Sequence, residues 1–144
     1  MLLAIIYHDL IIKVTRSDNE QRSAERMQQI LLADAGFPEA LVNRTKGHIL
    51  ATKKHEPSND PDTNYFVDAD LSILGSGREQ YARYASQVRK EYRRFPDLLY
   101  KPGRRKVLQH FLSQPAIFKT EWFRGRYERS AKENLEWELS HLTA

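Results

Sequence analysis

The sequence has no cysteine among its 144 residues. This absence excludes a disulfide framework, a zinc site built from thiolates, an iron–sulfur centre and a catalytic thiol. It leaves open a metal site made from histidine and aspartate. A long apolar run is missing too, because the apolar opening, residues 1–7, is far shorter than the roughly 20 residues of a membrane span. The opening also lacks the basic start and the cleavage site of a signal peptide, so we expect a cytoplasmic protein without a membrane partner.

No single sign of charge dominates, since 23 Lys and Arg stand against 19 Asp and Glu, for a net charge of +4. The two halves differ, however: residues 1–75 hold 8 basic and 11 acidic side chains, and residues 76–144 hold 15 and 8. The first half is thus suited to gather a cation and the second an anion, so we do not expect nucleic acid as a partner. With 40% hydrophobic and 29% charged residues, the composition and length predict one folded domain over residues 1–144.

Apolar residues recur mostly at helical spacing, and we find no convincing β alternation apart from an ambiguous run at residues 10–14. The two prolines and the turn formers of residues 56–63 predict a loop, and Lys101-Pro102-Gly103 predicts a turn. We therefore predict an all-α protein of about six to seven helices. Besides the apolar opening, the predicted helices cover residues 18–35, 37–55, 64–74, 78–95, 104–112 and 119–142.

Candidate ligands for a divalent ion begin with His8 and Asp9, an adjacent imidazole and carboxylate. Two further carboxylates, Asp68 and Asp70, lie in an apolar stretch where a charge is costly to bury without a partner or a metal. Two residues apart on a helix, they point about 200° from each other, so only one can face the site. A mixed nitrogen and oxygen set suits Mn²⁺, Zn²⁺, Mg²⁺ or Fe²⁺, which would activate water for attack on a phosphoryl group.

Other polar residues could assist such a site. His48 and His55 share one helical stripe with two threonines, and His55, beside the Asp-rich loop, is the better candidate for an acid or a phosphate contact. The alternative is that these side chains satisfy one another or water. In the basic segment 78–106, most Lys and Arg side chains are typical of a solvated face. Arg89 and Arg104 are better placed to reach a pocket, where a guanidinium can hold phosphate with two donors.

Several segments together resemble a bacterial branch of the HD superfamily of predicted metal-dependent phosphohydrolases. The resemblance runs through nearly the whole chain in matching order, and DNEQRSA and DADLSILG are its most specific motifs. It implies an all-α HD-type helical bundle. The matching segments are His8-Asp9, DNEQRSA at residues 18–24, ATKKH at 51–55, FVDADLSILG at 66–75, RKEY at 89–92, Gly103-Arg104 and Asn134-Leu135.

The resemblance also implies roles for particular residues. The His-Asp doublet of metal ligands maps to His8 and Asp9, and the distant aspartate ligand maps best to Asp70, with Asp68 as the fallback. Glu20 falls where many relatives carry the glutamate of a His-Glu pair, so it is a candidate for orienting water or substrate. The family normally has a further ligand histidine upstream of the doublet, and no histidine precedes His8 here. The sequence is thus short at its N-terminus relative to the family.

The resulting expectation is a phosphohydrolase that uses a divalent metal ion, with a small phosphorylated compound as substrate and a nucleotide as one candidate. Its metal ligands are His8, Asp9 and Asp70, and Glu20 or His55 assists proton transfer. Two alternatives stay open. The first is a degenerate HD domain that binds a nucleotide or RNA without cleaving it. The second is a regulatory domain with an apolar groove that is filled by another chain or by a second copy. Filling by a second copy would make a homodimer.

Overall fold

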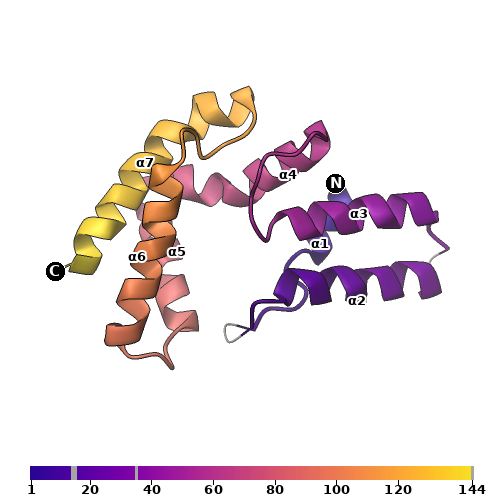
Figure 1. Cartoon of the computed structure of the whole chain (residues 1–144), viewed down its shortest axis with the longest axis horizontal. Coiled ribbons are helices and arrows are strands. Elements are labelled where there is room, and N and C mark those ends of the chain that lie inside the picture. Colours follow the sequence, from indigo (N-terminus) through magenta and orange to yellow (C-terminus); the bar gives the residue numbers. More distant parts are fainter. Residues whose placement is uncertain (14–15, 35, 144) are drawn as a thin grey trace. The chain divides into compact units, whose positions relative to one another are not determined.

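The computed structural model (Figure 1) describes residues 1–13, 16–34 and 36–143. Over these residues every regular element is helical, with seven α-helices, one 3₁₀ helix and no strand, which confirms the prediction of an all-α protein. The chain divides into two compact units, Met1–Asp70 and Leu71–Ala144, and the single domain expected over residues 1–144 stays a prediction. No helix in the described ranges is long and apolar enough to cross a membrane.

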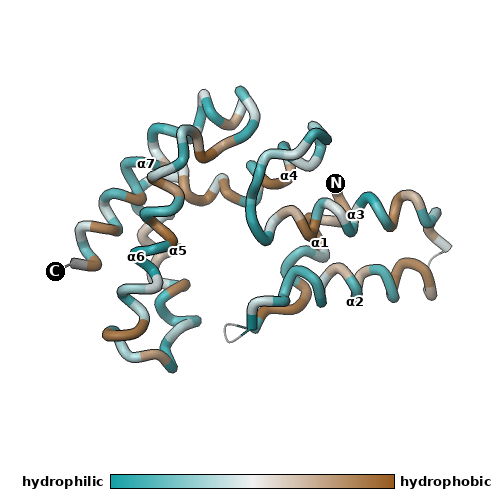
Figure 2. Tube along the Cα trace, viewed as in Figure 1, coloured by the Kyte–Doolittle hydropathy of each residue, from teal (hydrophilic) through white to brown (hydrophobic). Residues whose placement is uncertain are grey.

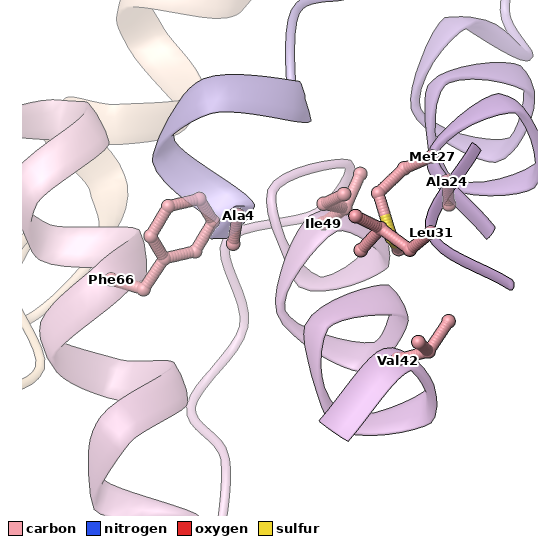
Figure 3. Packing of buried hydrophobic residues seen from close by; sticks show 7 residues of the cluster. All are labelled: Ala4, Ala24, Met27, Leu31, Val42, Ile49 and Phe66. Carbon is pink, nitrogen blue, oxygen red and sulfur yellow. The ribbon is translucent and has the colours of Figure 1, made fainter. Parts of the chain in front are cut away.

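The first unit begins with the short helix α1 (Leu2–Tyr7), which is followed by α2 (Asn19–Asp34), α3 (Glu39–Ala51) and α4 (Pro61–Leu71). Along α2 and α3 hydrophobic and hydrophilic stretches alternate (Figure 2), as expected for helices with one buried face. Their apolar faces meet α1 and α4 in one cluster of buried side chains (Figure 3). Its members are Ala4, Ala24, Met27, Leu31, Val42, Ile49 and Phe66.

The first unit departs from the prediction around residues 52–61. The helix expected over residues 37–55 ends at Ala51, because His55 adopts a left-handed backbone with φ 53° and donates its backbone N–H to the Ala51 carbonyl at 3.0 Å. Pro61 begins α4 instead of lying in a loop. A proline suits the first helical position because its missing N–H has no partner there anyway. Asp60 caps this helix by accepting the Asp62 N–H at 3.2 Å and the Thr63 hydroxyl at 2.9 Å.

The segment between α1 and α2, with its ambiguous β-like run, forms no strand over residues 10–13, and Val14 lies outside the described residues. Side chains from the first turns of α2 hold it instead. Asn19 accepts the Lys13 N–H and donates to the Lys13 carbonyl, both at 3.0 Å, and Ser23 accepts the Ile11 N–H at 3.0 Å. The helix predicted over residues 18–35 otherwise agrees with α2, although Ala35 also lies outside the described residues.

The second unit contains the 3₁₀ helix η1 (Ser72–Gly75) and the helices α5 (Arg78–Glu91), α6 (Asp97–Ser113) and α7 (Glu121–Thr143). The turn expected at residues 101–103 is wrong, because α6 continues through Pro102. Proline cannot donate to the carbonyl four residues earlier. That carbonyl belongs to Leu98, in the first turn of α6, a residue that is 84% exposed.

The contact between η1 and α7 is close. A Cβ atom placed on Gly75 would lie 2.6 Å from the Cβ of Tyr127 and 2.7 Å from its carbonyl oxygen, so only glycine allows the two backbones to approach this far. Asn134 on α7 adds two hydrogen bonds, donating its amide to the carbonyls of Leu74 and Ser76 at 2.8 Å each. The segment that follows α4 is thereby fixed to the last helix of the unit.

Candidate functional site

Three segments of the first unit bring two histidines to one aspartate. His8 Nε2 lies 3.3 Å from Asp70 Oδ1, and His55 Nε2 lies 3.0 Å from Asp70 Oδ2. The Asp9 carboxylate is 3.2 Å from the same His8 nitrogen. The side chains of His8 and His55 are each 20% exposed and that of Asp70 is 28% exposed, whereas that of Asp9 is 66% exposed. We refer to His8, Asp9, His55 and Asp70 as the His/Asp cluster.

The backbone of each segment explains how these side chains meet. His8 directly follows α1 and is oriented by a hydrogen bond of 3.0 Å between its Nδ1 and the Ile5 carbonyl, one turn earlier. Asp70 lies in the last turn of α4, four residues after Phe66, whose ring also contacts His8 edge-on with 5.7 Å between ring centroids. His55 reaches the same carboxylate because its left-handed backbone turns the chain after α3.

The electrostatics of the cluster couple His8 to Asp70. The hydrogen bond to Asp70 raises the pKa of His8, against the opposing effect of burial, and the charges of Asp9 and Asp70 raise it further, to about 9. Burial raises the pKa of Asp70, but the hydrogen bonds and charges of His55 and His8 outweigh it and hold this pKa at about 2. An ionised carboxylate can only accept hydrogen bonds, so both imidazoles donate Nε2–H to Asp70.

Two further residues of the first unit, Glu20 and Asp68, were also predicted to belong to the site. Glu20, in the first turn of α2, is near enough for its charge to contribute to a raised pKa of Asp9. Asp68 is fully buried on α4, while Asp70 is the aspartate whose carboxylate contacts both His8 and His55. Their roles as ligand, fallback ligand and water-orienting group stay predictions.

A second polar network in the first unit was not predicted from the sequence. His48 is 1% exposed and its Nδ1 lies 2.9 Å from the Thr63 hydroxyl oxygen, which donates to Asp60 at 2.9 Å. His48 Nδ1 is therefore the donor, and its Nε2 is a buried atom without a hydrogen-bond partner among the described residues. Burial lowers the pKa of His48. The helical stripe in the sequence identified His48 and Thr52, but not the partners on the next helix.

Both arginines predicted to hold phosphate lie in the second unit and already bind protein groups. Arg89 donates to Asp97 at 2.6 Å and to the carbonyls of Tyr92 and Phe95, in the segment that follows α5. Arg104 forms a two-pronged ion pair with Glu138, at 2.7 and 2.8 Å, in which both side chains are more than nine-tenths buried. The sequence offered no signal for this pairing, and phosphate binding by either arginine stays a prediction.

The donor chemistry of the His/Asp cluster fits a divalent ion, because it combines two imidazole nitrogens with carboxylate oxygens. The contact between His8 Nδ1 and a backbone carbonyl is the arrangement that commonly orients a metal-binding histidine. In the side-chain conformations described, no three His, Asp or Glu residues stand so that they could hold one ion together. The imidazole N–H groups of His8 and His55 face the carboxylate oxygens of Asp70 instead, so the Nε2 of His8 would have to lose its proton before it could bind an ion.

Comparison with known proteins adds no relative: no family model matches the chain, and no curated protein and no solved structure is significantly similar to it. The resemblance to the HD superfamily therefore stays a prediction from sequence motifs.

Proposed function

We propose that the chain is a metal-dependent phosphohydrolase with an HD-type helical fold, and that the His/Asp cluster is its metal centre. The observation that carries this proposal is the meeting of His8, Asp9, His55 and Asp70, which come from three separate segments of the sequence. Two imidazoles converging on a partly buried carboxylate supply ligands of the kind that Mn²⁺, Fe²⁺ and Zn²⁺ accept.

In this proposal His8, Asp9 and Asp70 hold the ion. When bound, a divalent ion lowers the pKa of a coordinated water and polarises a phosphoryl oxygen. Asp70 also accepts a hydrogen bond from His55. This bond keeps a proton on His55 Nε2 at the edge of the cluster, where His55 can donate it to the leaving-group oxygen of the phosphate ester. Glu20 acts on the same region through its charge, as its effect on Asp9 indicates, and would orient the attacking water.

The substrate is a small phosphorylated compound. The two arginines predicted to hold phosphate, Arg89 and Arg104, pair with Asp97 and Glu138 in the second unit, so the proposal rests on the His/Asp cluster and assigns neither arginine a contact with the substrate.

The deciding experiment measures metal content and turnover in the same preparation. The 144-residue chain is incubated with Mn²⁺, freed of excess ion, and examined by elemental analysis and by hydrolysis of p-nitrophenyl phosphate. We expect about one ion per chain, because the cluster offers a single set of ligands, and a turnover that Asp70→Asn abolishes. Asp62→Asn is the matched control, since Asp62 lies on the same helix but is half exposed and pairs with Arg44.

His55→Gln separates the two roles within the cluster. Because His55 is proposed to carry a proton rather than to hold the ion, this variant should keep the metal and lose about 10²-fold to 10⁴-fold in turnover. Absence of both bound metal and turnover in the wild-type protein would overturn the proposal, and the cluster would then be a hydrogen-bonded network in a non-catalytic module.

A further inference from the structure

The second unit contains a cavity of about 650 Å³ between α5 and α6, which the proposed phosphohydrolase chemistry does not use. Its volume lies within the range of pockets that enclose small organic ligands. We refer to it as the α5/α6 cavity. Four of its ten lining residues carry aromatic rings, namely Tyr84, Tyr92, Phe95 and Tyr100.

Three of these aromatic side chains contact one another and form a wall of the cavity. The ring of Tyr92 lies 6.0 Å from that of Phe95 and 5.8 Å from that of Tyr100, measured between centroids. The ring of Tyr100 is also fixed by a cation–π contact, because the Arg89 guanidinium lies 4.6 Å from its centroid and is itself held by a hydrogen bond to Asp97. Such a wall favours flat rings, which pack against aromatic side chains in offset or edge-on geometry.

One buried polar group on the cavity lining is only partly used. Arg104 gives Nε and Nη2 to Glu138, and its Nη1 makes no hydrogen bond to any residue that the structure describes. A ligand atom that accepts a hydrogen bond would therefore find a donor there. The ion pair also cancels the arginine's charge, and Glu91, the other charged lining residue, is acidic. The cavity thus carries no net positive charge that would favour an anion.

We propose that the α5/α6 cavity binds a planar, uncharged aromatic or heteroaromatic compound that carries a carbonyl-type hydrogen-bond acceptor. The ring packs against the aromatic wall, and the acceptor oxygen receives a hydrogen bond from Arg104 Nη1. Glu138 has a positioning role, because it holds the guanidinium in one orientation from the opposite edge. This proposal is independent of the His/Asp cluster and of any metal.

The test uses the full chain and the fluorophore 6-propionyl-2-(dimethylamino)naphthalene, which is flat, uncharged and carries a carbonyl group. We expect saturable binding of one molecule per chain with blue-shifted emission. Leu99→Trp places a bulky ring at the cavity lining and should weaken binding by about tenfold or more. The matched control is Leu98→Trp, because Leu98 is the neighbouring residue, does not line the cavity and is 84% exposed; its affinity should equal that of the wild type.

The acceptor requirement is tested with a second probe in which a methylene group replaces the carbonyl. In the wild-type protein the carbonyl probe should bind about tenfold more tightly, as expected for a hydrogen bond from a charged donor. Arg104→Lys keeps a cation beside Glu138 but removes Nη1, and should erase that difference. If this variant does not fold, the comparison of the two probes in the wild type still decides the point.

Three outcomes would overturn the proposal. The first is equal affinity of the fluorophore for the Leu99→Trp and Leu98→Trp variants. The second is tighter, Leu99-dependent binding of the anionic dye 8-anilinonaphthalene-1-sulfonate, which would show that the cavity selects an anion. The third is a dimer in light scattering that Leu99→Trp dissociates, because a second copy of the chain would then be the occupant.

Discussion

His55 donates Nε2–H to Asp70 Oδ2 at 3.0 Å from a residue whose φ is 53°. Non-glycine residues rarely adopt this backbone, and it costs on the order of 1 kcal/mol or more. The hydrogen bond to an ionised, partly buried carboxylate is a stronger interaction than a neutral one. It therefore helps to offset the backbone cost, and strain of this kind often accompanies functional sites.

The protonation of His8 gives the first prediction. In the metal-free protein the imidazole resonances of His8 should titrate with a pKa of about 9, raised chiefly by the hydrogen bond to Asp70. Asp70→Asn removes the negative charge and should lower this pKa toward about 6.5, the ordinary value. NMR spectroscopy over pH 5–10 measures both, and Asp62→Asn should leave the titration unchanged. A pKa near 6.5 for His8 in the wild-type protein would contradict the geometry of the cluster.

The stability of the fold should depend on pH through the same pair. The raised pKa of His8 contributes stability that is fully present below about pH 6.5 and is lost as the pH rises through about 9. The lowered pKa of Asp70 contributes stability that is present above about pH 4 and is lost as the pH falls through about 2. The free energy of unfolding of the wild type should therefore exceed that of Asp70→Asn most strongly between pH 4 and 6.5, by up to about 3 kcal/mol.

Denaturant titrations at several pH values measure this difference. The comparison uses two chains that differ at one side chain, so other titrating groups cancel to a first approximation. If the difference in the free energy of unfolding between the wild type and Asp70→Asn stays constant from pH 5 to pH 10, Asp70 does not raise the pKa of His8 in the folded protein, and the prediction is wrong.

The buried ion pair of the second unit provides a third prediction. Glu138→Gln would leave Arg104 with its charge buried and unpaired, and would weaken the contact with the Tyr81 hydroxyl, which donates to Glu138 at 2.5 Å. Loss of one partner of a buried pair typically costs about 3–5 kcal/mol. Glu133→Gln, on the same helix, breaks the exposed pair with Arg129 and should change stability by less than about 1 kcal/mol. Equal effects of the two substitutions in thermal unfolding would refute the assignment.

The close approach of η1 to α7 predicts the effect of single methyl groups. Gly75→Ala would place its Cβ 2.6 Å from Tyr127 Cβ, and should destabilise the protein by about 1–3 kcal/mol through overpacking. Gly125→Ala, within α7, meets no atom within 4 Å and should instead stabilise the helix by about 0.5–1 kcal/mol. Opposite shifts in the midpoint of thermal unfolding are expected, and a neutral Gly75→Ala would contradict this packing.

Local signals predicted some helices closely. The capping residues before Asn19 and the glycine at position 36 placed the ends of the second helix to within a residue or so of α2. The prediction for α6 was wrong at Pro102-Gly103, because these two residue types are typical of a turn, whereas α6 continues through both of them. The left-handed turn at His55 was missed because its stabilising contact is with Asp70, fifteen residues away.

The candidate site shows the same division between local and distant information. His8, Asp9, His55 and Asp70 were identified from residue type, a helical stripe and a family resemblance, all of which can be read along the chain. The partners of His48 and Arg104 were not identified, because Thr63 and Glu138 are separated from them by 15 and 34 residues. Neither pair has a periodic signal, and only tertiary packing brings them together.

Asparagine side chains fasten three irregular segments, and each uses its amide more than once. Asn19 and Asn64 each pair with both the N–H and the carbonyl of one residue, Lys13 and Ser58, while Asn134 donates twice. Aspartate has the same shape but no donor at neutral pH. Slow deamidation during storage would therefore replace a donor with a charge facing a carbonyl oxygen. Peptide mapping of these positions, combined with the free energy of unfolding, would measure the effect of that change.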